Sequence, residues 1–158
     1  MQAVWIIAEV FAAYVVADAI SGLYHMATDK GMNLRSQIEM FQDHHVTNTM
    51  QDFDWQTFAA GMVGGIIGAW FHSPFIVALA IFGALTQVTH YYAHRTSGNR
   101  VIRAVVRALQ ELRIIVHPAS HQRHHASRKF DRDFCLLSGW NNWWLNQVVR
   151  LFERRATA

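Results

Sequence analysis

Long apolar stretches alternate with polar segments along this chain, and the apolar stretches have the length of membrane-spanning helices. No Asp, Glu, Lys or Arg occurs from Trp55 to His94, which leaves room for two spans of about 20 residues each. Before His25 the only charged residues are Glu9 and Asp18. The pattern therefore predicts about three transmembrane helices.

The turn signals between the apolar stretches predict where these helices begin and end. The first span is expected over residues 4–19 and continues as a helix to Asp29. The second covers residues 56–71 and the third residues 74–92. A short turn ending at Pro74 joins them into an antiparallel hairpin, because proline suits the first position of a helix. The N-terminal stretch lacks a basic segment and a cleavage site, so we expect a retained helix and not a signal peptide.

Polar and amphipathic segments complete the expected fold. Residues 33–54 carry several acidic side chains and must lie outside the bilayer core. Residues 100–116 are predicted to form an amphipathic helix on the membrane, with arginines on one face and apolar side chains on the other. Residues 140–152 form a second interfacial segment, whose tryptophans suit headgroup depth. The expected fold class is an all-α, multi-pass integral membrane protein with interfacial amphipathic helices.

Composition and charge give this topology an orientation. Hydrophobic residues make up 52% of the chain and charged residues 16%, whereas soluble domains average about 25% charged residues. All 14 Lys and Arg residues lie between residues 25 and 55 or after His94, and the positive-inside rule makes that side cytoplasmic. The length fits a single domain covering residues 1–158. The single Cys135 excludes an internal disulfide, and we expect no nucleic-acid partner.

The histidines follow the same partition and indicate a metal site on the cytoplasmic side. Eight of them come from four separate segments and reach that membrane surface, and neutral imidazole is the commonest protein ligand for Fe, Zn, Cu and Ni. The eight are His25, His44, His45, His90, His94, His121, His124 and His125. His72 falls on the opposite side and His117 lies outside the repeated spacing, so neither is expected to bind metal.

The spacing of these histidines places them on shared helix faces, because residues i and i+3 or i+4 are neighbours on a helix. The motifs are Asp18-x-x-x-Gly22-x-x-His25-x-x-x-Asp29, Phe41-x-x-His44-His45, His90-x-x-x-His94 and His121-x-x-His124-His125. Eight nitrogens exceed the four ligands of a tetrahedral zinc and suit two ions. Two neighbouring irons are what is needed to split O2 and remove hydrogen from an unactivated CH2 group. A solvated basic surface run, with Arg123, Arg128 and Lys129, is the alternative for the last motif.

In this order the motifs resemble the plasmanylethanolamine desaturase family, also called Kua or lipid desaturase-domain proteins, to which the plant plastid palmitoyl 3-trans desaturase is similar. The resemblance covers nearly the whole chain. Its segments are residues 17–25, Phe41-Gln42-Asp43-His44-His45, Thr89-His90 to His94, Leu109-Gln110-Glu111 to His125, Phe134-Cys135, and Gly139-Trp140-x-Asn142. The family usually continues with Asp-Pro after the histidine pair, whereas Val46-Thr47 follow here.

The resemblance implies an O2-dependent di-iron oxidoreductase that introduces the vinyl ether double bond of plasmalogen-type ether phospholipids. It also implies that the eight histidines hold the two Fe ions. Asp18 and Asp29 match acidic positions of the first motif, as partners behind the ligands or occasional ligands. An acyl-chain desaturase and a lipid hydroxylase would share the same metal site, so both stay open. The non-enzymatic alternative is a metal-binding membrane protein such as a transporter or a haem carrier.

The expected partners are a membrane lipid, O2 and a separate electron donor. A ferredoxin or a cytochrome b5-like protein is the candidate donor, because a single domain leaves no room for a fused carrier. A basic face formed by Arg100, Arg103, Arg107 and Arg123 is expected to dock an acidic donor.

Overall fold

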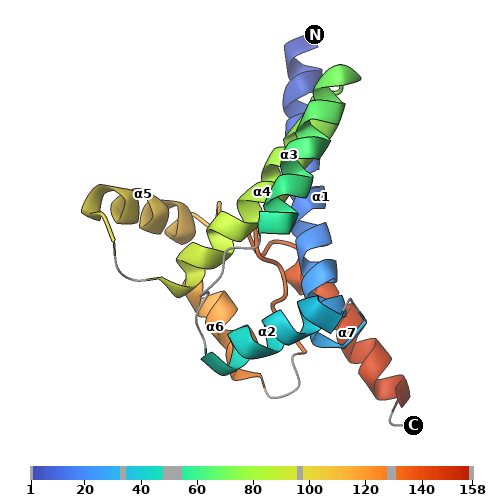
Figure 1. The fold of residues 1–158 in the computed structure, drawn as a ribbon, viewed down its shortest axis with the longest axis vertical. Coiled ribbons are helices and arrows are strands. Elements are labelled where there is room, and N and C mark those ends of the chain that lie inside the picture. Colours follow the sequence, from blue (N-terminus) through green and yellow to red (C-terminus); the bar gives the residue numbers. More distant parts are fainter. Residues whose placement is uncertain (1, 33–34, 48–54, 96–97, 128–130, 157–158) are drawn as a thin grey trace.

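A computed structural model gives the fold of residues 2–32, 35–47, 55–95, 98–127 and 131–156. The elements in these ranges are all helices, and no strand occurs among them. They are α1 (Gln2–Asp29), α2 (Arg35–Thr47), α3 (Trp55–Trp70), α4 (Pro74–His94), α5 (Arg100–Glu111), α6 (Pro118–Ala126) and α7 (Asn142–Ala156). Three of them, α1, α3 and α4, form an elongated rod, and the others surround its lower end (Figure 1).

The predicted hairpin of α3 and α4 is confirmed, and its turn has a physical basis. Pro74 opens α4, and the Ser73 side chain caps the helix by accepting a hydrogen bond from the backbone N–H of Ile76. His72 turns the chain with a positive φ of 52°. Close approach of the helices depends on Gly68, where an added Cβ would lie 2.7 Å from the backbone nitrogen of Val77.

Two of the three expected membrane spans have the length of a span in this structure. By length and composition, α1 and α4 are each long and apolar enough to cross a membrane, whereas α3 contains only a shorter apolar stretch, Phe58–Trp70. Large apolar side chains such as Trp5, Ile7 and Ile66 are mostly exposed on the rod, and a surface of this kind needs an apolar surrounding. The finding is an all-helical protein with two candidate spans and an apolar hairpin partner.

The C-terminal segment folds back over α1 and forms a small core there. Phe134, Cys135, Leu145 and Val149 are buried together, with Met26 of α1 packed against them. Cys135 is a small buried residue of this core, and its burial raises the pKa of the thiol well above the ordinary range. This core holds residues 133–141 against the lower half of α1.

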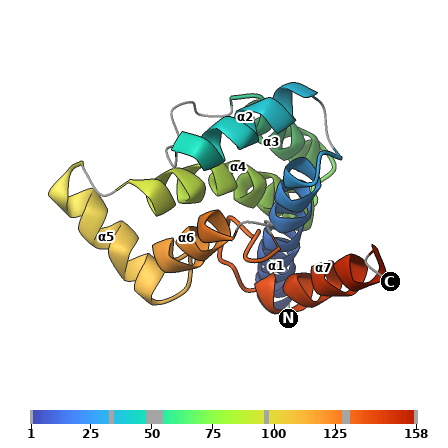
Figure 2. The same cartoon turned by 90° about the horizontal axis from the view of Figure 1, so that it is seen from below.

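The amphipathic helix α5 is confirmed, with a shorter range than expected. Asn99 caps its N-terminus by accepting hydrogen bonds from the backbone N–H groups of Val101 and Ile102. The helix ends at Glu111 instead of continuing to residue 116, because Arg113 turns the chain with a positive φ of 57°. Seen from below, α5 and α7 project to opposite sides of the rod (Figure 2).

Candidate metal centre

Four helices bring the candidate metal-binding side chains to the lower end of the rod. His25 and Asp29 lie in the last turns of α1. The C-terminal turns of α2 and α4 contribute histidines as well. Helix α6 begins with Pro118 and carries three more histidines within nine residues. All eight histidines expected as ligands fall into two groups. Within each group, the candidate ligand atoms lie within 4.8 Å of one another.

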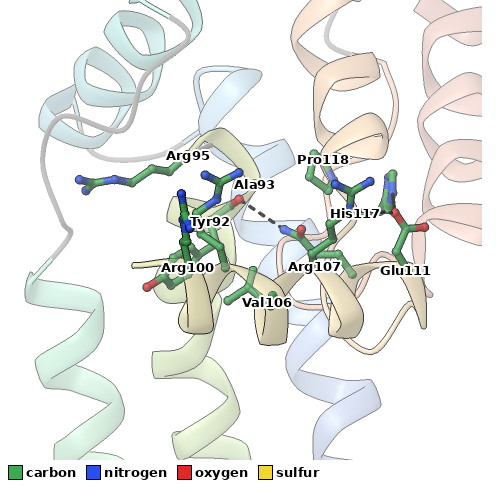
Figure 3. A pocket seen from close by; sticks show the side chains of 12 residues that line it. Tyr92, Ala93, Arg95, Arg100, Val106, Arg107, Glu111, His117 and Pro118 are labelled. Atoms are coloured by element: carbon green, nitrogen blue, oxygen red, sulfur yellow. Dashed lines mark hydrogen bonds and ion pairs between the residues drawn. The ribbon is translucent and has the colours of Figure 1, made fainter. Parts of the chain in front are cut away.

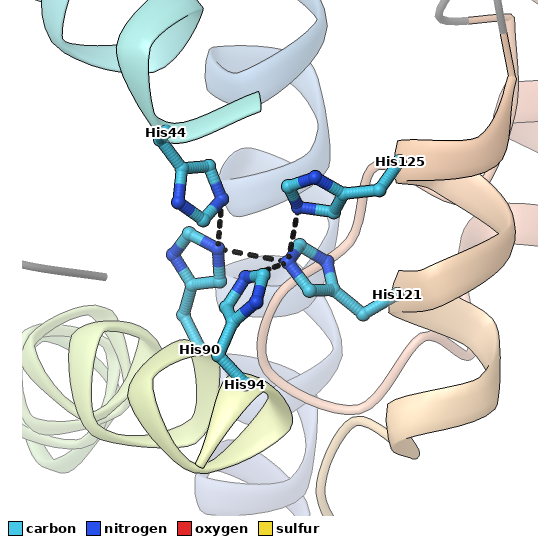
Figure 4. Close-up of side chains that lie close together, drawn as sticks. All are labelled: His44, His90, His94, His121 and His125. Carbon is cyan, nitrogen blue, oxygen red and sulfur yellow. Dashed lines mark hydrogen bonds between the residues drawn. The ribbon is translucent and has the colours of Figure 1, made fainter. Parts of the chain in front are cut away.

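The first group consists of five imidazoles and no carboxylate (Figure 4). Its members come from α2, α4 and α6 and are His44, His90, His94, His121 and His125. The Nε2 atom of His121 lies 3.0 Å from Nε2 of His90 and 2.6 Å from Nε2 of His94. The same atom lies 3.0 Å from Nε2 of His125.

This convergence fits metal binding better than hydrogen bonding. A neutral imidazole nitrogen carries either one proton or one lone pair, so Nε2 of His121 can form a proper hydrogen bond with one of its three neighbours at most. Two nitrogens at right angles on one ion, each about 2.1 Å from it, lie about 3.0 Å apart. The observed separations of 3.0, 2.6 and 3.0 Å are therefore those of donors aimed at a shared point.

The second group combines three imidazoles with one carboxylate. One oxygen of Asp29 lies 2.9 Å from Nε2 of His45, and its other oxygen lies 3.2 Å from Nε2 of His124 and 3.4 Å from Nε2 of His25. The side chain of Asp29 is fully buried. A buried carboxylate among three imidazoles matches the mixed nitrogen and oxygen ligand sets of transition metals.

The two groups are adjacent, and imidazole rings of one group lie next to rings of the other. The ring centroids of His25 and His90, one from each group, are 6.0 Å apart, and those of His44 and His45 are 5.5 Å apart. Two ions held in these groups would be neighbours. The residues present therefore fit a pair of metal ions.

Backbone carbonyls orient two of the rings. Nδ1 of His25 lies 3.0 Å from the carbonyl oxygen of Phe134, and Nδ1 of His124 lies 2.7 Å from that of Arg132. Donation from Nδ1 leaves the lone pair on Nε2, which points into the group. These two carbonyls escaped the sequence-based prediction because a backbone partner leaves no signal in residue identity.

Burial keeps two of the α6 imidazoles, those of His121 and His125, in the neutral form that binds metal. It lowers the pKa of His121 well below the ordinary value, and the nearby rings of His90 and His94 lower it further. Burial lowers the pKa of His125 to about 2, with His44 as the next contributor. Because both pKa values are lowered, these rings are uncharged at neutral pH.

Asp18, the other acidic candidate, lies outside both groups and bonds to the C-terminal segment. One carboxylate oxygen accepts hydrogen bonds from the backbone N–H groups of Ser138 and Gly139, at 2.7 and 3.0 Å. The other accepts from the backbone and side-chain N–H groups of Asn141, at 3.0 and 3.1 Å. Asn141 is thus a positioning residue that sequence reasoning missed, because the segment Gly139-Trp140-x-Asn142 left position 141 unspecified.

The remaining candidates lie outside the two metal groups. His72 lies exposed in the α3–α4 turn, at the far end of the rod. His117 caps α6 through Nδ1, which accepts a hydrogen bond from the backbone N–H of Ala119. The expected basic face loses one member, because the Arg123 guanidinium contacts Asp133 at 3.0 Å. Arg128 and Lys129 lie outside the described residues.

Comparison with known proteins gives the family of this chain. The family model of the lipid desaturase domain matches residues 14–156. The chain belongs to the lipid desaturase domain family. The matched range includes every histidine of both groups, together with Asp18 and Asn141.

Named relatives of this lipid desaturase domain come from plants, bacteria and animals. Fatty acid desaturase 4, chloroplastic, of Arabidopsis thaliana is 30% identical over 84% of this chain and 45% of that protein. Plasmanylethanolamine desaturase of Myxococcus xanthus is 25% identical over 87% of this chain and 54% of that protein. Plasmanylethanolamine desaturase 1 of Mus musculus is 26% identical over 94% and 63%, respectively. The chain thus spans about half the length of these curated relatives, and no solved structure matches it.

Proposed function

We propose that this protein is an O2-dependent di-iron desaturase of membrane lipids, with the vinyl ether bond of plasmalogen-type phospholipids as its product. The observation that carries the proposal is the pair of adjacent donor groups at one end of an apolar helical rod. The eight histidines would hold two iron ions, and Asp29 would complete the second group. Asp18 would act through the C-terminal segment that it anchors, and not as a ligand.

The proposed membrane placement follows from the rod and the charges. Helices α1 and α4 would cross the bilayer, and α3 would complete the third span as the antiparallel partner of α4. All 14 Lys and Arg residues then lie on the side of the metal centre, which would be cytoplasmic by the positive-inside rule. A transporter needs donors through the depth of the membrane, whereas these donors gather at one end of the rod.

The reaction removes two hydrogens from adjacent CH2 groups of a lipid chain. O2 is reduced to two waters by four electrons, of which two come from the C–H bonds and two from an external donor, together with two protons. Two bound iron ions supply O2 activation and hydrogen abstraction. The protein would orient the donors through the carbonyls of Phe134 and Arg132, and the buried rings would exclude water.

A basic pocket beside the metal centre supports a phospholipid substrate (Figure 3). The pocket has a volume of about 560 Å³ and is lined by Arg95, Arg100, Arg103 and Arg107. Its one acidic lining residue, Glu111, already contacts Arg107 at 3.8 Å. Guanidinium groups suit phosphate because their N–H donors match its oxygens. A lipid phosphate bound there would leave its chains near the donors of α4 and α6.

A second candidate, an acyl-chain desaturase, is favoured by the name of the Arabidopsis thaliana relative, Fatty acid desaturase 4. Lipid mass spectrometry separates the two. Cells that express the protein are fed an alkylglycerol, and His124→Ala serves as the control. A loss of two hydrogens that creates an acid-labile vinyl ether supports the first proposal, and a loss confined to acyl chains supports the second. No change in either chain, with iron present in the protein, contradicts both.

The electron donor would be a separate ferredoxin or cytochrome b5-like protein. Without the paired Arg123, the α5 arginines are what remains of the expected basic face, and because they also line the phosphate pocket, docking is tested in the absence of lipid substrate. Reversal of those charges should slow reduction at low salt. An unchanged reduction rate would exclude docking at this surface.

A further inference from the structure

A narrow groove runs along the rod between α1 and α3, with α4 as its floor. Both α1 and α3 pack mainly against α4, which leaves a cavity of about 220 Å³ between them. Its lining residues are Ala17, Ile20, Ser21 and Tyr24 from α1, Gly61 from α3, Leu79, Ala80, Gly83, Thr86 and Gln87 from α4, and Leu136 from the C-terminal segment. The groove lies within the apolar part of the protein.

Two polar side chains that line this groove use their hydroxyl groups in hydrogen bonds with the backbone. Thr86 donates a hydrogen bond of 2.6 Å to the carbonyl of Gly83. Ser21 donates to the carbonyl of Asp18 and accepts from the backbone N–H of Leu136. The surface that remains is mainly hydrocarbon, which suits an alkyl chain better than a polar ligand.

Gly83 lacks the packing reason that explains other glycines of the rod. An added Cβ at Gly61 would lie 2.9 Å from the carbonyl oxygen of Ala80, so the close contact of α3 and α4 requires glycine there. An added Cβ at Gly83 meets no atom within 4 Å. Glycine inside a helix is destabilising relative to alanine, and here the missing side chain leaves only open groove.

The groove leads to the metal centre. Ser21 and Thr86 each lie four residues, about one helical turn, before a donor of the centre, His25 and His90 respectively. Leu136 follows Phe134, whose carbonyl orients His25. Gly83 lies seven residues before His90 on the same helix, which is about 10 Å along the helix axis. Anything that lies in the groove therefore has one end beside the donors.

We propose that this groove holds the hydrocarbon chain of the substrate lipid beyond the carbons that react, and that Gly83 determines how long a chain fits. The inference rests on the proposed function only in taking a lipid chain as the substrate. A chain with an octyl tail would end short of Gly83, whereas an octadecyl chain would pass it. A larger side chain at residue 83 would obstruct only the longer chain.

The test compares Gly83→Leu with the wild-type protein on two ether phospholipids that differ only in an octyl or octadecyl chain. The expected result is at least a tenfold fall in the ratio of octadecyl to octyl desaturation. Gly83→Ala should give a smaller shift in the same direction and a stability equal to or above wild type. Leu85→Phe adds bulk to an exposed position of the same helix and should leave the ratio unchanged.

A binding measurement separates this inference from the proposed function. Octadecyl phospholipid should raise the midpoint of thermal unfolding of the wild-type protein in detergent, because ligand binding stabilises the folded state. The increase should be lost in Gly83→Leu, with iron content unchanged. Equal octadecyl binding by both proteins, or an equal loss of activity on both chains, would overturn the role of Gly83. Wild-type binding without desaturation of any lipid would contradict the proposed function alone.

Discussion

Replacement of Asp18 by asparagine tests how the C-terminal segment supports the metal centre. The Asp18 carboxylate accepts four N–H hydrogen bonds from residues 138–141, two at each oxygen. Asparagine keeps one oxygen and presents an NH2 group where the other stood. In either orientation of the amide, two buried N–H donors face another donor.

The magnitude follows from these four bonds. A hydrogen bond to a charged group contributes about 1.5–3 kcal/mol, so the loss of two costs about 3–6 kcal/mol. The free energy of unfolding of a whole domain is only about 5–15 kcal/mol. We therefore expect Asp18→Asn to lower the midpoint of thermal unfolding by at least about 6 °C. Iron content should fall with it, because the same segment carries the carbonyl that orients His25.

Thermal unfolding in detergent and iron analysis of the purified protein measure both effects. Glu9→Gln is the matched control, because it makes the same chemical change on the same helix at an exposed position. The control should behave as wild type. An Asp18→Asn protein with wild-type unfolding temperature and full iron would refute the anchoring role of the carboxylate.

Three further substitutions, two of them with a matched control, test the donors and the helix contacts. His124→Ala should remove iron and activity together, whereas His72→Asn, in the distant turn, should keep both; full iron in the first variant would exclude His124 as a ligand. Gly22→Ala should destabilise the protein by about 1–3 kcal/mol, measured by thermal unfolding, because the added Cβ would lie 2.5 Å from a buried cysteine sulfur. Gly68→Ala should loosen the α3–α4 hairpin, whose backbones meet there, whereas Gly65→Ala should not, since its Cβ has no neighbour closer than 3.9 Å; equal unfolding temperatures for this pair would contradict the packing argument.

The positions of most helices along the chain could be predicted from the apolar stretches and the turn residues. The uncharged stretch and Pro74 located α3 and α4 to within a few residues. Helix α2 (Arg35–Thr47) was expected only as a polar segment outside the bilayer, because its residues lack a long apolar face. The end of α5 could not be predicted either, because a positive φ at Arg113 has no clear sequence signal.

The convergence of the histidines could be predicted, but their division between two groups could not. The i, i+4 spacings place donors on one helix face, yet the two groups separate neighbours in sequence such as His44 and His45. That division depends on how four helices meet at the end of the rod. The role of Asp18 also needed the structure, because its four partners lie about 120 residues further along the chain.

The origin of the donors has a consequence for how such a protein is made in the cell. Five of the nine donor residues belong to α2 and α6, which lie outside the apolar rod. In the proposed membrane placement the rod would enter a bilayer during synthesis without them, and the proposed iron ions, bound afterwards from the aqueous side, would fasten these two helices over the rod. Under iron starvation, the freshly made chain would keep its donor helices loosely attached and accessible to proteases. Iron supply would then determine the amount of this protein in the cell as well as its catalytic activity.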